Sequence, residues 1–143
     1  MGLWNFVKNA GKSLVGGAEA APAPADLTKE IEALGLDATG MDITVDGDTV
    51  KVSGDAVSQE MKEKIILAVG NVEGVAAVDD EVANAGGDPV FHTVERGDTL
   101  SAIAKATLGS ANKYNAIFEA NKPMLSHPDK IYPGQVLRIP QDA

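Results

Sequence analysis

Two segments rich in alanine, glycine and proline interrupt the chain, and they limit what it can fold into. One covers residues 13–25 and the other covers residues 84–89. Such a composition favours a semi-extended linker over a helix or a buried strand. A domain of about 60 residues buries only about 60% of its unfolded surface, so the remaining blocks, 26–83 and 90–141, each suit one small domain. The pattern predicts two small domains behind a separate N-terminal segment, residues 1–12.

The composition excludes several classes of function. The chain has no cysteine, so disulfides and thiolate metal ligands are excluded. Its formal net charge of −9 at pH 7 disfavours nucleic acid and anionic membranes as partners, because both require a basic face. No run approaches the roughly 18 apolar residues of a membrane span, and the first residues lack the basic start and apolar run of a signal peptide. We therefore expect a cytoplasmic protein with no nucleic-acid partner and no membrane span.

Residues 26–83 show the periodicity of an open α+β domain. Asp26 is a good N-cap residue, and Gly35 follows the last apolar residue of the first helix. Asp46-Gly47 lies between two β-branched runs, which is typical of a hairpin turn. The predicted elements are a helix over 26–34, strands over 43–45 and 49–53, a helix over 58–69 and a strand over 75–78. This order predicts one compact unit of the form αββαβ.

Residues 90–141 predict a second and smaller α+β unit. Thr99 is expected to cap the first of its two helices, and Pro133-Gly134 marks a turn before the last strand. The predicted elements are a strand over 91–94, helices over 99–106 and 113–120, and a strand over 136–139. This unit therefore has the order βααβ.

The N-terminal segment predicts a short amphipathic helix. Apolar residues recur there at helical spacing, at Leu3, Phe6, Val7 and Ala10. A helix of this length is not stable alone, and large aromatic side chains such as Trp4 are costly to expose. We expect the helix to dock on the rest of the protein, with binding to a membrane surface as the alternative.

The sequence favours a non-enzymatic protein. A zinc site needs three or four ligands, and only two histidines, His92 and His127, are present. A hydrolase could use His92 with Asp98 and Ser101, but Asp98 is expected to form a turn before a helix cap. The acidic run over 79–81 is expected to be a solvated strand end, and attraction of cations is the alternative.

Two predicted helix ends offer main-chain oxygen atoms to a cation. The last carbonyl groups of a helix lack intrahelical partners and carry the negative end of the helix dipole. One predicted end comprises Val7 to Ala10 before Gly11, and the other lies at Gly70. Neutral carbonyl oxygens suit potassium, which is large and weakly hydrated. Because many helices end in glycine, the pattern alone leaves open whether either end binds an ion.

The last block closely resembles the LysM domain family. The matching stretches are His92 to Val94, Arg96 to Ala104, Ile117 to Asn121 and Ile131 to Pro140. In that family a groove between two loops binds polymers of N-acetylglucosamine. The resemblance implies the groove residues Gly97, Asp98, Thr99, Leu100, Met124, Ile131 and Tyr132. Without an export signal the unit is expected to serve instead as a packing partner for the middle block, and glycan binding is the alternative function.

The middle block resembles the BON domain family, through Val50 to Gly54 and Asn71 to Val78. The whole arrangement is similar to a bacterial family of cytoplasmic potassium-binding proteins. That resemblance implies a monovalent cation, potassium, that locks the domains together. It implies backbone carbonyl ligands, which we place at Val7, Ala10, Gly70, Val72 and Val75. Gly70 is expected to matter through its backbone geometry.

Overall fold

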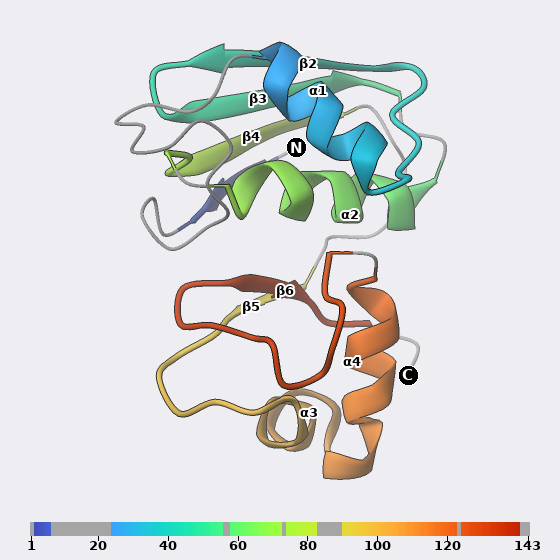
Figure 1. Cartoon of the computed structure of the whole chain (residues 1–143), viewed down its shortest axis with the longest axis vertical. Helices are drawn as coiled ribbons and strands as arrows, with labels where there is room; N and C mark the ends of the chain where they lie inside the picture. The colour runs from blue at the N-terminus through green and yellow to red at the C-terminus, as the bar shows by residue number, and fades with distance from the viewer. Residues whose placement is uncertain are drawn as a thin grey trace. The chain divides into compact units, whose positions relative to one another are not determined.

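The chain folds into two compact units, residues 1–87 and residues 88–143. The computed structural model describes residues 2–6, 24–55, 58–72, 74–82, 90–122 and 124–140. Each unit combines helices with a β-sheet (Figure 1), so the predicted α+β class is confirmed. None of the helices in these ranges has the length and apolarity needed to cross a bilayer.

The first unit is a four-stranded sheet with two helices packed on it. The strands are β1 (Gly2–Asn5), β2 (Met41–Asp46), β3 (Thr49–Gly54) and β4 (Ala77–Val82), and the helices are α1 (Pro24–Ala33) and α2 (Gln59–Gly70). The sheet order is β1-β4-β3-β2, with β3 and β4 parallel and the other pairs antiparallel. From α1 onward the order is αββαβ, as predicted.

The core of this unit lies between the sheet and the helices. Val50 and Val52 of β3 and Val78 of β4 are each 0% exposed, whereas Lys51 and Asp79 on the other face of the sheet are not buried. Leu27 and Ile31 of α1 and the apolar face of α2 cover the three valines. The two-residue turn between β2 and β3 contains Gly47 at φ +65°, which confirms the predicted hairpin.

Two element boundaries differ from the prediction. Helix α1 begins at Pro24, inside the predicted linker, because proline suits a first helical position where no N–H is needed. Asp26 is therefore not the N-cap residue, and its carboxylate lies in the first turn near the positive end of the dipole. Strand β4 begins at Ala77 rather than Val75 and continues to Val82, so the acidic run over 79–81 is part of the sheet.

The prediction of a helix at the N-terminus is wrong for residues 2–5, which form strand β1. In its register with β4, Leu3 lies opposite Asp79 and Trp4 lies opposite Val78. Leu3 is 61% exposed, whereas Trp4 is partly buried, so the side chains alternate as a strand requires. A short helix has too few hydrogen bonds to be stable, and pairing with the edge of β4 supplies them. The expected docking on the rest of the protein takes place through this pairing.

The second unit packs two helices against a two-stranded antiparallel sheet. Its elements are β5 (Phe91–Thr93), α3 (Leu100–Leu108), the 3-10 helix η1 (Ala111–Lys113), α4 (Tyr114–Ala120) and β6 (Val136–Arg138). The order βααβ is the predicted one. Its core residues are Val94, Leu100, Ile103, Ala104, Ile117, Leu125, Leu137 and Ile139.

Asn121 joins the end of α4 to β6 in the second unit. Its side-chain amide donates to the carbonyl oxygens of Ile117 at 2.7 Å and Arg138 at 2.9 Å. Its side-chain oxygen accepts the Arg138 N–H at 2.7 Å. All three bonds are made by one side chain that is 2% exposed, so the asparagine is a structural residue.

Candidate functional site

Helix α2 ends beside a tight turn, and the two together form the candidate site. The helix begins at Gln59, after the N-cap residue Ser58, whose hydroxyl accepts the Met61 N–H at 3.0 Å. It ends at Gly70, where the Asn71 N–H still bonds to the Leu67 carbonyl at 2.9 Å. The carbonyls that follow Leu67 belong to the last turn, which has no intrahelical donors. This end therefore carries partial negative charge on neutral main-chain oxygens.

The turn after α2 holds the next two predicted ligands. The Val75 N–H bonds to the Val72 carbonyl at 3.1 Å, so these two residues close a single turn. Gly74 lies inside this turn at φ +99°, a conformation that favours glycine. Val72 is 1% exposed and Val75 is 0% exposed, so the main chain here lies in the protein interior.

Phe6 is packed directly on this helix end. Its N–H donates to the carbonyl of Ala76 at 2.9 Å, which extends the pairing of β1 past Asn5. A Cβ atom placed on Gly70 would lie closer than 3.0 Å to three atoms of the Phe6 ring, Cζ, Cε1 and Cε2. Phe6 is 8% exposed, so the ring fills the space that a side chain at position 70 would take.

The structure thus groups three of the five predicted ligands, Gly70, Val72 and Val75, within one helix end and its turn. Val7 and Ala10 lie outside the described residues. The sequence predicted Phe6 only as one of the apolar residues of the docking segment. Its place on Gly70 was not predicted, because the contact joins two distant parts of the chain.

The buried carboxylate of the acidic run is paired within the first unit. Asp80 of β4 is buried and pairs with Lys62 of α2 at 3.1 Å, and its other oxygen accepts the Val82 N–H at 3.1 Å. The acidic run is therefore not the solvated strand end that the sequence predicted. Within the described ranges, no three His, Cys, Asp or Glu side chains are grouped as a metal site would require.

The opposite face of the sheet carries a more exposed charge group. Lys51 of β3 pairs with Glu81 of β4 at 3.1 Å. This hydrogen bond and then one from Asp79 hold the pKa of Glu81 below its usual value. Partial burial and the bond with Glu81 raise the pKa of Asp79. These charges compensate one another at the surface.

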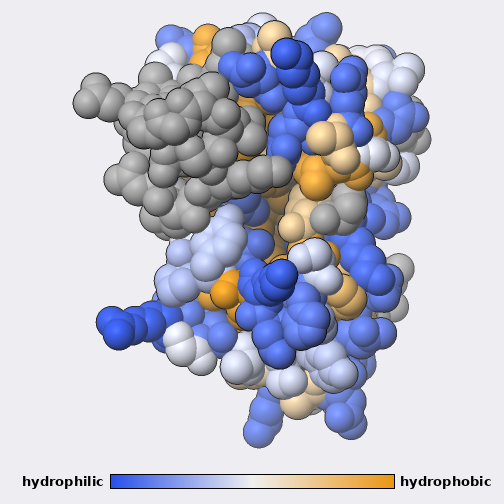
Figure 2. Space-filling view, in the orientation of Figure 1, coloured by the Kyte–Doolittle hydropathy of each residue, from blue (hydrophilic) through white to orange (hydrophobic). Residues whose placement is uncertain are grey.

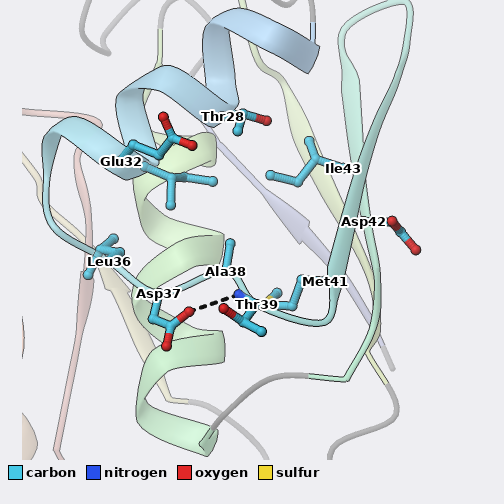
Figure 3. A pocket seen from close by; sticks show the side chains of 10 residues that line it. Thr28, Glu32, Leu36, Asp37, Ala38, Thr39, Met41, Asp42 and Ile43 are labelled. Carbon is cyan, nitrogen blue, oxygen red and sulfur yellow. Dashed lines mark hydrogen bonds between the residues drawn. The ribbon is translucent and has the colours of Figure 1, made fainter.

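A pocket of about 450 Å³ opens between α1 and β2 in the first unit (Figure 3). Its residues are Thr28, Ile31, Glu32, Leu36, Asp37, Ala38, Thr39, Met41, Asp42 and Ile43. The Asp37 carboxylate accepts the Thr39 N–H at 2.9 Å, and hydrogen bonding with Thr39 lowers the pKa of Asp37. Among the described residues, the predicted ligands Gly70, Val72 and Val75 do not line this pocket.

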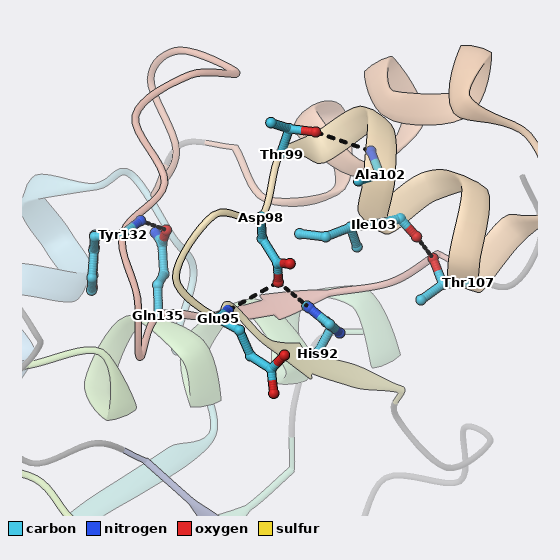
Figure 4. Close-up of polar contacts among 9 residues, drawn as sticks. All are labelled: His92, Glu95, Asp98, Thr99, Ala102, Ile103, Thr107, Tyr132 and Gln135. Atoms are coloured by element: carbon cyan, nitrogen blue, oxygen red, sulfur yellow. Dashed lines mark hydrogen bonds and ion pairs between the residues drawn. The ribbon is translucent and has the colours of Figure 1, made fainter.

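In the second unit, Asp98 organises the loop before α3 (Figure 4). Its carboxylate accepts the Glu95 N–H at 2.9 Å and lies 3.1 Å from Nε2 of His92. The Glu95 bond and then the His92 bond hold the pKa of Asp98 below its usual value. Thr99 caps α3 by accepting the Ala102 N–H at 3.1 Å, as predicted. The His92–Asp98 pair thus has a structural use in fixing this loop.

A pocket of about 380 Å³ lies beside the start of α3. Its residues are Thr99, Leu100, Ser101, Tyr114, His127, Pro128 and Asp129. Two of the predicted groove residues, Thr99 and Leu100, line it, and the other five do not. Of these other five, Ile131 packs against the core, and burial raises the pKa of Tyr132.

Hydrophilic side chains cover much of the described surface in the view of Figure 2.

Comparison with known proteins identifies both units. The BON domain family matches residues 23–85, and the LysM domain family matches residues 92–140. The chain is 50% identical over 149 residues to the potassium binding protein Kbp of Escherichia coli O6:H1, which covers 99% of this chain and 100% of that protein. It is also 48% identical over 54 residues to an uncharacterized protein of Deinococcus radiodurans, which covers 38% of this chain and 20% of that protein.

Proposed function

This chain belongs to the BON–LysM family of the potassium binding protein Kbp, and from that premise we propose that it binds potassium. The observation that carries the proposal is the 50% identity that extends over 99% of the chain. We further propose that the protein acts in the cytoplasm, without catalysis, as a sensor of the ion. The ion is held by main-chain carbonyls and locks the parts of the chain together.

The chemistry of the helix end supports a monovalent ion. The main-chain oxygens of Gly70, Val72 and Val75 are neutral, and potassium is well served by neutral carbonyls. Magnesium requires a small octahedral shell, usually with carboxylates, and within the described ranges no three His, Cys, Asp or Glu side chains are grouped as a metal site would require. Val7 and Ala10, the other two proposed ligands, follow Phe6 in the sequence by one and four positions. The docking of Phe6 on Gly70 therefore supports a site that the N-terminal segment completes.

Calorimetric titration tests this proposal. Potassium chloride added to the full chain should give a saturable heat signal, and sodium chloride at the same ionic strength should give a much weaker one. An ion that binds only the folded state adds about 2.7 kcal/mol of stability at a hundredfold excess over its Kd. Equal and featureless heats for both salts would reject potassium binding.

Glycan binding by the LysM unit is the second candidate. The observation in its favour is the pocket beside α3, which Thr99 and Leu100 line together with Tyr114. A shallow apolar floor with nearby polar groups suits an acetamido sugar. Chitin oligomers titrated into the same calorimetric sample separate the two candidates, and we expect them to bind weakly or not at all. Saturable heat from the oligomers together with none from potassium would favour the glycan function.

A further inference from the structure

We propose that Phe6 is the positioning residue of the cation site, and that Gly70 lacks a side chain in order to receive its ring. The inference rests on the proposed potassium function and extends it. The contact between Phe6 and Gly70 brings the N-terminal segment to the end of α2. The contact also gives a role to a residue that is not itself a ligand.

Gly70 has no conformational need to be glycine. It lies in the last turn of α2, and it is absent from the glycines with positive φ in the described chain. Alanine would suit a helical backbone better than glycine by about 1 kcal/mol. What alanine would disturb is the Phe6 ring, since its Cβ would lie closer than 3.0 Å to Cζ, Cε1 and Cε2. The glycine therefore provides space for the aromatic ring.

The main chain of Phe6 is fixed as well as its ring. The bond from its N–H to the Ala76 carbonyl, 2.9 Å long, ties it to the residue after Val75. Ala76 in turn donates its N–H to the Asp48 carbonyl at 2.8 Å, which anchors this stretch to the β2–β3 turn. Phe6 is thus held at both ends of the candidate site, by its ring at Gly70 and by its backbone at Ala76.

This attachment restricts the ligand that follows. Consecutive Cα atoms are about 3.8 Å apart, so the docked Phe6 fixes the point beside the α2 end from which the chain continues. Without the ring, the chain would have to order this segment at the moment of binding, and that cost would weaken affinity. Cation binding and the docking of Phe6 are therefore linked, and each stabilises the other.

Leu3 provides a matched control for Phe6. Both are large apolar residues of the same N-terminal segment, but Leu3 is 61% exposed and Phe6 is 8% exposed. We expect Phe6→Ala to raise the potassium Kd about tenfold or more, and Leu3→Ala to change it less than about twofold, since only the first removes a buried ring. The melting temperature is measured in parallel in potassium chloride and sodium chloride. A purely structural residue would lower both equally, whereas a positioning residue reduces the difference between them.

A double-mutant cycle isolates the contact between the two residues. In the unmodified chain, Gly70→Ala should weaken potassium binding about tenfold, because the new methyl group displaces the ring. In the Phe6→Ala background the same change should have an effect of about twofold or less, since the ring is gone. Circular dichroism and the emission of Trp4, the one tryptophan, check that each variant folds and that β1 stays paired.

The outcomes separate this inference from the proposed function. If the unmodified chain binds potassium and Phe6→Ala binds it equally well, the positioning role is overturned while potassium binding stands. An equal effect of Gly70→Ala in both backgrounds would also overturn it. If the unmodified chain shows no preference for potassium, the proposed function fails and the positioning role fails with it.

Discussion

Two glycines near the end of α2 serve different physical needs. Gly74 has φ +99°, so its need is conformational. Gly70 is helical, and its missing side chain makes room for Phe6. The sequence predicted that Gly70 matters through its backbone geometry, whereas the structure shows no positive φ there and a Phe6 ring beside it. Sequence identifies a glycine at a helix end, but it does not identify the ring that approaches it from a distant part of the chain.

The pH dependence of the LysM unit should depend on Asp98. Its pKa in the folded state lies below the ordinary value of 3.8, first because of the Glu95 N–H and then because of His92. A carboxyl group with a lowered pKa stabilises the fold above its unfolded pKa, and this stability is lost as pH falls through the folded pKa. We therefore expect the β5–β6 amides to lose protection against hydrogen exchange as the pH falls through the ordinary carboxyl pKa of 3.8 and below it.

The variant Asp98→Asn isolates this effect. It retains an oxygen that can accept the Glu95 N–H but loses the charge. Its protection should be weaker than that of the unmodified chain at pH 7, and it should change less on acidification. Identical pH profiles for both chains would contradict the assignment. Glu119→Gln changes an exposed carboxylate of α4 that pairs with Lys122, and it serves as the control.

At the scale of elements, the N-terminal strand shows the limit of periodicity. In the sequence, four apolar positions among the first ten residues have the spacing of an amphipathic helix. The structure forms β1 instead, because the edge of β4 offers backbone partners from Ala77 to Asp80. Two local signals were predicted correctly: Thr99 caps its helix, and Asp46-Gly47 turns the hairpin. Pairing with a distant strand leaves no such local signal.

The buried ion pair between α2 and β4 is a second element-level feature that the sequence analysis missed. Lys62 and Asp80 have side chains that are 6% and 2% exposed. Removing one partner of such a pair leaves an uncompensated buried charge, which costs about 3–5 kcal/mol. We expect Asp80→Ala to lower the free energy of unfolding by about this amount in a urea titration.

The pairing on the other face of the same strand provides the control. Glu81→Ala breaks the exposed bond to Lys51, and its effect on unfolding should be much smaller. The double variant Lys62→Met/Asp80→Leu should recover most of the stability lost in Asp80→Ala, because no charge remains buried. If Asp80→Ala unfolds at the same urea concentration as Glu81→Ala, the buried pair is not important for stability.

At the scale of the whole molecule, a chain of two small units carries one proposed function. The order of elements in both units followed from local patterns, because each motif lies within about 60 consecutive residues. The sequence predicted only part of the candidate site. The helix end and its turn are local features, whereas the arrival of Phe6 depends on tertiary packing. The proposed site therefore depends on a contact between Phe6 near the N-terminus and Gly70 at the end of α2.

Carbonyl ¹³C spectra of the full labelled chain show whether the carbonyls at the end of α2 bind the ion. During a titration with potassium at constant ionic strength, the carbonyl resonances of Gly70, Val72 and Val75 should shift and saturate together with those of Val7 and Ala10. Sodium should shift them much less, and the β6 carbonyl of Leu137 should not move. Carbonyls over 70–75 that respond identically to both ions, or not at all, would contradict the account.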